Sequence, residues 1–597
     1  MICIAHGCAA VAQARRRHRR KDRNMHRAKQ VFGDFGVRGL VALALLVAVA
    51  GCRERLTDYH KPGEFAPLPK GTVSLYKTPW RANVRTASAY EALHGVGVYY
   101  KHIPPWTEAE HTLVIEQMAA AGVRRLRIAI LHGMYITKDW TAPGEGELRD
   151  MRNILRACKA AGIRPCATFC HIPPAGKAGT QELQEWWHRG WNTELLPVGE
   201  VGSPEFKAYL DKTYEALVFL LREARDAGFT QPESWDLELC QSMWWGAPAT
   251  STPWPSTTLN DLQPGGRFYE FGRDLILRLR KDKFVSPTVW WAYTHHLFDD
   301  CTDSEVPPEA AGRAISFYSQ GIGLSTSDWL AQSKDTWPVR PEHMFLEGDP
   351  PDLVLARPEG WMADRTRHEN MIDLINTSKT PVAVTSLGTV PSAIHNAKAH
   401  GLNGWQIKQR ALTRSLAFWL NQGSPFVLLH SAYEGADDDM SHALIPEIKD
   451  IGKFKWQDAP PLVTMQAFCG ALAGARPLKK PDELNFRYAV DPDPVLVPAT
   501  GDAGPLRASD AVTLLPFQID LKKFAVAAYV MTPNIAKPMS PAKMTLEIDK
   551  KINGGASILR PYTQHESQAR ILKQNDNATT VEFDIADDVT WLVFEAE

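Results

Sequence analysis

Residues 119–130, AAAGVRRLRIAI, pass from the end of an amphipathic helix through Gly122 into a short apolar strand. The same pattern recurs in residues 160–169, AAGIRPCATF, and in residues 226–239, DAGFTQPESWDLEL. A glycine directly after a helix is typical of the position where the backbone turns left-handed and the helix ends. Helices that alternate with apolar strands in this way predict βα units and a parallel sheet.

Further apolar runs and amphipathic stretches continue this alternation along the chain. Strands are expected at residues 95–100, 288–293, 314–318, 381–385 and 425–429, and helices at about 205–227, 266–281, 362–376 and 405–422. Together with the first three units this makes eight strands, which predicts an α/β fold, a (β/α)8 TIM barrel, over residues 89–452. A doubly wound open sheet is the alternative, but no Gly-x-Gly-x-x-Gly motif or P-loop follows any of the strands in the sequence.

The pattern changes after residue 452, where short alternating runs are separated by Pro, Asp, Asn and Gly. Strands are expected at residues 486–490, 511–515, 525–531, 544–548, 579–585 and 590–594. We predict no helix between them, so residues 453–597 are expected to form an all-β sandwich domain. Its expected role is to pack against the barrel.

The composition is that of an ordinary globular protein with a surplus of tryptophan. The chain has 597 residues, of which 44% are hydrophobic and 23% charged, and 67 Lys and Arg balance 68 Asp and Glu. These values exclude a disordered chain and a coiled coil. They show no excess of basic residues of the kind that binds nucleic acid. The 19 tryptophans, against 15 tyrosines, exceed what a core needs, because a buried indole N–H requires a partner.

The first 52 residues have the pattern of an export signal. A basic run, Arg15–Arg20, precedes the apolar stretch 39–50, GLVALALLVAVA, which is too short to span a bilayer of about 30 Å. Val49–Cys52, VAGC, resembles a bacterial lipobox, and this resemblance implies that Cys52 is lipidated. We therefore expect a signal peptide over residues 1–52 and a tether over 53–88. The protein is then exported and lipid-anchored to the bacterial cell envelope, in the periplasm or at the outer-membrane surface.

The remaining cysteines do not form a metal site in the sequence. None of them belongs to a CxxC motif or to a Cys/His cluster with metal-ligand spacing: Cys158, Cys166, Cys170, Cys240, Cys301 and Cys469. They are interpreted as small buried residues, and neither a metal nor a cofactor is expected.

Aromatic and hydrogen-bonding residues gather at the predicted strand ends. In a (β/α)8 barrel the active site lies at the C-terminal ends of the strands. Aromatic rings stack on sugar rings, while His, Gln and Tyr bind hydroxyl groups. The sequence therefore predicts a membrane-anchored protein whose partner is an oligo- or polysaccharide. The expected substrate-binding residues are His132, His171, Gln241, Ser242, Trp244, Trp245, Tyr293, His295, Tyr318, Ser386 and His430.

Three predicted strands carry motifs that resemble a known family. Gly122–Arg127 reads GVRRLR, Trp235–Leu239 reads WDLEL, and Pro381–Gly388 reads PVAVTSLG. These motifs look like those of the retaining (β/α)8 glycoside hydrolases of the β-xylosidase/α-iduronidase type. That family also carries a C-terminal β-sandwich, so the resemblance covers about residues 90–597.

The resemblance breaks down where the family keeps its catalytic pair. Strand four of the family ends in Glu-Leu-Trp-Asn-Glu-Pro, whose last Glu is the general acid/base, and strand seven ends in Thr-Glu-Phe-Gly, whose Glu is the nucleophile. Here Gln241 stands at the Asn, Ser242 at the acid/base and Ser386 at the nucleophile. Retaining hydrolysis needs two carboxyl groups about 5 Å apart, and serine performs neither role unless a base activates it.

Three functions stay open at this point. The first is a glycoside-hydrolase-like enzyme with relocated carboxylates, for which Glu238 and Glu434 are the candidate catalytic residues. The second is a pseudo-glycosidase that binds glycan without cleaving it. The third is a carbohydrate esterase that pairs Ser242 or Ser386 with a strand-end histidine: His295, His296 or His430. We favour the first because the predicted cleft is rich in aromatic and hydrogen-bonding residues.

Overall fold

The structure, a computed structural model, describes the barrel strands, most of the helices between them and the C-terminal sheets. The described residues are 96–100, 106–128, 145–170, 199–231, 234–241, 264–281, 287–292, 306–317, 381–388, 402–421, 424–433, 443–472, 475–478, 484–497, 506–530, 532 and 538–597. The signal peptide, the lipidated Cys52 and the tether lie outside these residues and stay predictions, as do the domain boundaries.

Eight parallel strands close into a barrel in the order β1 to β8. Their bounds are β1 Val96–Tyr100, β2 Arg125–Ile128, β3 Arg164–Cys170, β4 Asp236–Gln241, β5 Thr288–Ala292, β6 Gly312–Phe317, β7 Val382–Gly388 and β8 Val427–His430. The barrel closes where β1 pairs with β8, with Val96 opposite Val427. The predicted (β/α)8 fold is therefore confirmed.

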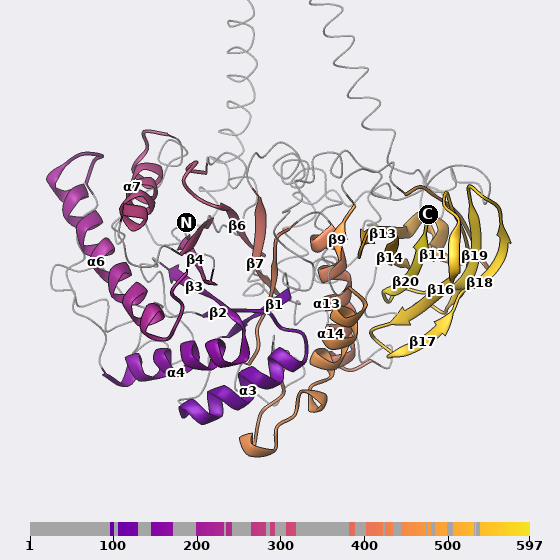
Figure 1. Cartoon of the computed structure of the whole chain (residues 1–597), viewed down its shortest axis with the longest axis horizontal. Helices are drawn as coiled ribbons and strands as arrows, with labels where there is room; N and C mark the ends of the chain where they lie inside the picture. The colour runs from indigo at the N-terminus through magenta and orange to yellow at the C-terminus, as the bar shows by residue number, and fades with distance from the viewer. Residues whose placement is uncertain are drawn as a thin grey trace, which may run out of the picture. The chain divides into compact units, whose positions relative to one another are not determined.

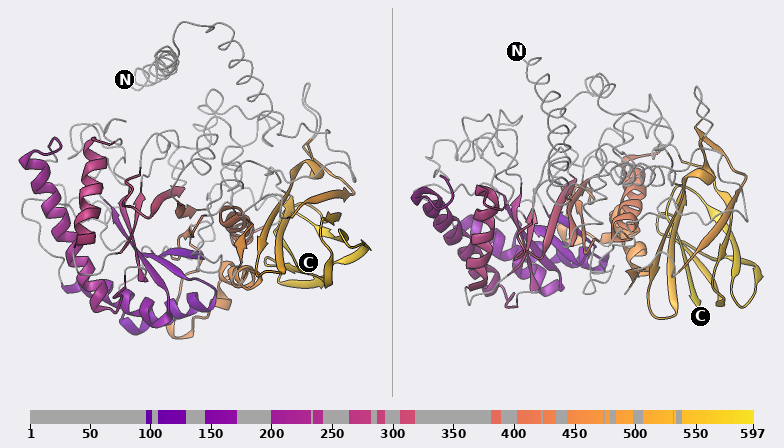
Figure 2. Two further views of the ribbon diagram at one scale, coloured as in Figure 1. Left: turned by 45° about the horizontal axis from the view of Figure 1, so that its top comes forward. Right: turned by 90° about the horizontal axis from the view of Figure 1, so that it is seen from above.

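Helices cover the outside of the barrel (Figure 1; Figure 2). They are α3 Glu108–Ala120, α4 Glu145–Ala161, α6 Pro204–Asp226, α7 Arg267–Lys281 and α13 Gly404–Asn421. The glycines that the sequence placed after three of them adopt positive φ, at 97° for Gly122, 68° for Gly162 and 98° for Gly228. Such angles favour glycine, so each helix ends where its glycine lies. The helix expected at 362–376 lies outside the described residues.

A helix that the sequence analysis did not predict, α14 (Pro460–Ala471), follows the barrel. It packs against α13 through a hydrogen bond from Gln409 Nε2 to Thr464 Oγ1 of 2.7 Å. It also reaches the end of α3, where the Cys469 thiol lies 3.8 Å from the Gly122 carbonyl oxygen. These contacts put α14 in the place of the eighth barrel helix. Two short 3-10 turns, η9 (Ile451–Lys453) and η10 (Trp456–Asp458), lead into it.

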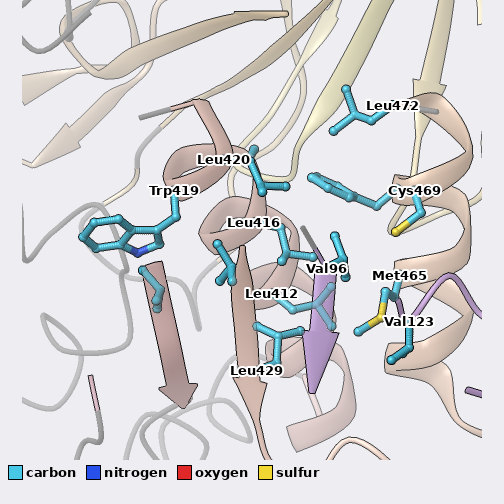
Figure 3. Packing of buried hydrophobic residues seen from close by; sticks show 14 of the residues in the cluster. Val96, Val123, Leu412, Leu416, Trp419, Leu420, Leu429, Met465, Cys469 and Leu472 are labelled. Carbon is cyan, nitrogen blue, oxygen red and sulfur yellow. The ribbon is translucent and has the colours of Figure 1, made fainter. Parts of the chain in front are cut away.

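The core between β1, β8, α13 and α14 explains why α14 has no polar face (Figure 3). Met465 and Cys469 lie on the side of Val96 and Val123, all of them buried. On its other side, Phe468 meets Trp591 of the C-terminal sheets, with ring centroids 5.2 Å apart. Because α14 is covered on these two sides and exposes only Gln466 and Gly470, it is mostly apolar and lacks the amphipathic period by which helices are found in a sequence.

The C-terminal region is built from antiparallel sheets, as the sequence predicts. The larger sheet has the order β17-β16-β20-β14-β13-β9, the smaller β10-β15-β19-β18, and β11 pairs with β12. The bounds are β9 Arg476–Pro477, β10 Phe486–Asp491, β11 Val495–Val497, β12 Leu506–Arg507, β13 Val512–Gln518, β14 Lys523–Val530, β15 Ala542–Ile548, β16 Ile552–Arg560, β17 His565–Gln568, β18 Arg570–Gln574, β19 Thr579–Ile585 and β20 Thr590–Ala596. Six of these strands were not predicted. β9, β11 and β12 are two or three residues long. Gly554 and Gly555 interrupt β16, and β17 and β18 are edge strands without a buried face.

No described helix is both long and apolar enough to cross a membrane.

Candidate functional site

The C-terminal end of the barrel, called the mouth below, is fixed on the side of β8 and β1 by backbone hydrogen bonds. The amide of Ala432, two residues past β8, donates to the carbonyl of Tyr99 in β1 at 2.8 Å. The chain then returns, and Leu444 and Ile445 donate to the carbonyls of Ser431 and Ala432 at 2.9 and 3.0 Å. On this side of the mouth, backbone hydrogen bonds therefore hold β1, the residues after β8 and residues 444–445 in place.

Four rings cluster beside these hydrogen bonds. The Tyr100 hydroxyl and His111 Nδ1 are 3.0 Å apart, and the centroids of Trp106 and His111 are 5.7 Å apart. Trp106 also meets Tyr433, with centroids 5.6 Å apart. Burial lowers the pKa of His111 to about 4, against weaker opposing effects of Asp150 and Glu110, so the imidazole is neutral at pH 7. The cluster joins the ends of β1 and β8 to the first turn of α3.

The barrel interior just below the mouth contains a buried ion pair. Arg127 on β2 donates from Nε to Glu238 Oε2 on β4 at 2.7 Å, and its Nη2 lies 2.7 Å from the same oxygen. The Thr168 hydroxyl donates to Oε2 at 2.8 Å and the Thr385 hydroxyl to Oε1 at 2.6 Å. The guanidinium of Arg127 stacks on the ring of Tyr99, 4.4 Å from its centroid. Burial is the largest single effect on the pKa of Arg127 and lowers it, but Glu238, Tyr99 and Cys166 together outweigh burial and raise the guanidinium pKa.

A second charged layer closes the barrel on the opposite side from the mouth. Asp236 on β4 pairs with Arg125 and also accepts from Arg164, with Nε 2.7 Å from its Oδ2. The indole N–H of Trp290 donates to Asp236 Oδ1 at 2.9 Å. Phe426 covers this layer, with the Arg125 guanidinium 4.4 Å from its ring centroid. This charged layer stabilises the barrel rather than contacting substrate, because barrel active sites lie at the other end.

These contacts show what Glu238 does inside the barrel. Its side chain is 0% exposed, and both oxygens already accept hydrogen bonds from β2, β3 and β7. A carboxylate held in this way braces four strands. Glu238 lies inside the barrel, whereas its catalytic role stays a prediction that these contacts do not favour.

The partners of Glu238 were not predicted from the sequence, although a signal for them is present there. Arg125 and Arg127 are two residues apart on β2, and Asp236 and Glu238 are two apart on β4. Because side chains on a strand alternate, each pair shares one face. Two cations and two carboxylates facing into one barrel predict ion pairs between the strands.

Two of the barrel strands carry a β-bulge close to the mouth. Between β3 and β4, Phe169 pairs with Leu239 and Cys170 with Gln241, so Cys240 is an extra residue on β4. Between β6 and β7, Ile315 pairs with Val384 and Ser316 with Ser386, so Thr385 is an extra residue on β7. Bulges concentrate at barrel rims and next to active sites, where they redirect side chains. The bulge on β4 also interrupts strict alternation between Glu238 and Ser242.

The predicted site residues fall into two groups. Gln241, Ser386 and His430 lie in the last residues of β4, β7 and β8, opposite Cys170, Ser316 and Gly388, which places their backbones at the mouth. The others lie outside the described residues: His132, His171, Ser242, Trp244, Trp245, Tyr293, His295, Tyr318 and Glu434. Within the described part of the chain, no group of three or more His, Cys, Asp or Glu residues could hold a metal ion.

Comparisons with known proteins find similarity to glycoside hydrolases of (β/α)8 fold at low identity. A family 39 glycoside hydrolase from Bacteroides cellulosilyticus is 13% identical, with 84% of this chain and 82% of that chain covered and a TM-score of 0.41. A family 5 glycoside hydrolase from Bacteroides vulgatus is 12% identical, with 84% and 89% covered and a TM-score of 0.41. An exo-β-1,4-mannosidase from an Opitutaceae bacterium is 12% identical, with 66% and 61% covered and a TM-score of 0.37. No protein-family model and no curated protein matches the chain. These values assign neither a reaction nor a substrate.

Proposed function

We propose that the protein is a glycoside-hydrolase-like carbohydrate-active protein that takes an oligo- or polysaccharide at the mouth of its barrel. The observation that carries the proposal is the pair of bulges on β4 and β7, at Cys240, two residues before Ser242, and at Thr385, directly before Ser386. A barrel can close from regular strands, so it does not need these bulges. Bulges are common next to active sites, and their presence on β4 and β7 supports a site between the ends of these strands. The aromatic and histidine residues that follow the strand ends in the sequence supply surfaces that suit sugars.

Cleavage of a glycosidic bond at this mouth requires carboxyl groups that substrate can reach. Glu238 is buried, and both of its oxygens accept hydrogen bonds, so we assign it to holding the barrel strands in place rather than to catalysis. Glu434 directly follows Tyr433 in the chain, just past the end of β8, and we propose it as one catalytic carboxylate. The acidic residues after β5 and β8 supply the second: Asp299, Asp300, Asp437, Asp438 and Asp439.

A non-catalytic glycan-binding protein is the second candidate, and one observation favours it. Glu238 is the carboxylate nearest in sequence to the family's acid/base position, and it already accepts hydrogen bonds from Arg127 and two threonines. With Ser242 and Ser386 at the family's catalytic positions, such a barrel would bind sugar and leave it intact.

One experiment separates these candidates. The full chain without its signal is titrated calorimetrically with xylo-, manno- and cello-oligosaccharides of two to six units, and the products are then analysed by chromatography. Binding with cleavage supports the hydrolase, and binding without cleavage supports the pseudo-glycosidase. Trp244→Ala is expected to weaken binding about tenfold or more, since aromatic stacking is worth roughly 1 kcal/mol or more. Absence of binding to every oligosaccharide would contradict the proposal.

We also propose that lipidated Cys52 anchors the protein to the bacterial cell envelope. The support is the sequence alone, since VAGC follows a short apolar stretch at residues 39–50. Such an anchor would hold the barrel at the membrane surface, where an exported glycan is accessible.

A further inference from the structure

The C-terminal sheets dock on one side of α13 through polar side chains. Tyr562, in the turn after β16, faces Arg410 of α13, whose guanidinium carbon lies 5.9 Å from the ring centroid. Arg410 also forms a buried ion pair with Asp587 in the turn after β19. Near the end of the helix, Asn421 donates to the carbonyl of Pro516 in β13 at 2.7 Å. Residues 410 and 421 together form what we call the docking stripe.

The docking stripe fixes how the C-terminal sheets are placed along the barrel. A buried ion pair and directional hydrogen bonds tolerate less sliding than an apolar contact, because any shift leaves buried polar groups unpaired. Asp587 strengthens this point, since it also accepts from the Thr532 hydroxyl at 3.3 Å and from the Met539 amide at 3.0 Å.

The first residues of α13 lie at the level of the mouth. The helix connects the C-terminal end of β7 to the N-terminal end of β8, so it runs antiparallel to the strands and begins at the mouth. A direct contact agrees with this, because Lys408 Nζ donates to the carbonyl of Ala443 at 2.7 Å. Ala443 directly precedes Leu444, which is bonded to Ser431 just past the end of β8.

The turn Pro561–Gln564 contacts α13 through Tyr562 and Arg410, near the start of the helix, and therefore lies near the same level. Tyr562 is half-buried, while Thr563, Gln564 and His565 are exposed. Gln564 has φ of 54°, a left-handed conformation that glycine adopts without steric cost. The turn thus presents a hydroxyl and an amide, and His565 at the start of β17 adds an imidazole; these groups hydrogen-bond sugar hydroxyls.

We propose that the turn Pro561–Gln564 is a wall of the glycan site and binds sugar units of a chain that extends past the barrel mouth. The C-terminal sheets are then part of the site as well as packing for the barrel. This inference rests on the proposed function, since it names a second contact for the same glycan.

The test compares short and long oligosaccharides on the full chain. The double variant Thr563→Ala, Gln564→Gly removes two side chains and keeps a residue suited to the positive φ. The probes are tri- and hexasaccharides of the xylo, manno and cello series, with calorimetric titration as the readout. We expect about tenfold weaker hexasaccharide binding, the loss of roughly one to two hydrogen bonds, and unchanged trisaccharide binding.

The matched control is Asn577→Gly, an exposed residue in the turn between β18 and β19, at the opposite end of the sheets. It is expected to leave both affinities unchanged. Thermal melting of all variants checks that they fold as the wild type does. Hexasaccharide binding by the double variant equal to wild type would overturn this inference alone. Failure of the wild type to bind any of the probes would overturn it together with the proposed function.

Discussion

Replacing Glu238 with alanine is expected to destabilise the barrel by about 3–5 kcal/mol, the usual cost of breaking a buried ion pair from one side. The side chains of Arg127 and Glu238 are 1% and 0% exposed, so no water replaces the lost carboxylate. The change leaves a buried guanidinium without its counter-charge and the hydroxyls of Thr168 and Thr385 without their acceptor. Glu238→Gln keeps the shape and one acceptor, so a smaller loss of about 2 kcal/mol is expected.

Equilibrium urea unfolding, followed by tryptophan fluorescence, measures these losses. The matched control is the double variant Arg127→Met, Glu238→Leu, because replacing a whole buried pair by apolar side chains of similar volume is often neutral. The double variant should therefore recover most of the stability that Glu238→Ala loses.

Two results would refute the reasoning. One is a Glu238→Ala protein that unfolds at the wild-type urea concentration. The other is a double variant that is as unstable as the single one. A Glu238→Gln protein that keeps its stability and loses hydrolysis would instead restore Glu238 to a catalytic role.

Three further predictions concern pH, packing and location. Burial lowers the pKa of His111 to about 4, whereas the same imidazole in the unfolded chain has a pKa of about 6.5. As pH falls below 6.5, the unfolded chain therefore takes up a proton before the folded protein does. About 3 kcal/mol of the unfolding free energy present above pH 6.5 should be lost by pH 4. His111→Phe should remove this dependence in urea unfolding at pH 4.5 and 7, whereas the exposed control His565→Gln should keep it. Gly312→Ala should cost about 1–3 kcal/mol, since its Cβ would collide with a backbone carbonyl and lie 2.7 Å from the Trp290 ring; an unchanged melting temperature would contradict this packing. Cys52→Ala should move the protein from the membrane fraction to the soluble fraction, and unchanged partitioning in an immunoblot would argue against lipidation.

Much of the barrel could be predicted because its signals are local. The glycines Gly122, Gly162 and Gly228 end their helices, and the strands β2, β3 and β4 are short apolar runs that follow these helices. The C-terminal strands were found where one face is buried, as in β10 and β19. Helix α14 was missed because both of its sides are covered, and this removes the periodic pattern of a surface helix.

The candidate site could be predicted only in part. Gln241, Ser386 and His430 lie at strand ends, as expected, because the order of the elements alone puts strand ends at one mouth. The role of Glu238 depends on partners far away in the chain. Arg127 lies 111 residues before it, and Thr385 lies 147 residues after it.

The amino-acid sequence by itself determined the alternation of helices and strands, and hence the barrel and the end at which a site can form. Those features depend on contacts within a few residues, or on a periodicity that each element repeats. Only the tertiary structure decided which inward charges pair, where β4 and β7 bulge, and that the C-terminal sheets dock beside the mouth. These depend on the register at which eight strands close, because a shift of one residue turns every inward side chain outward.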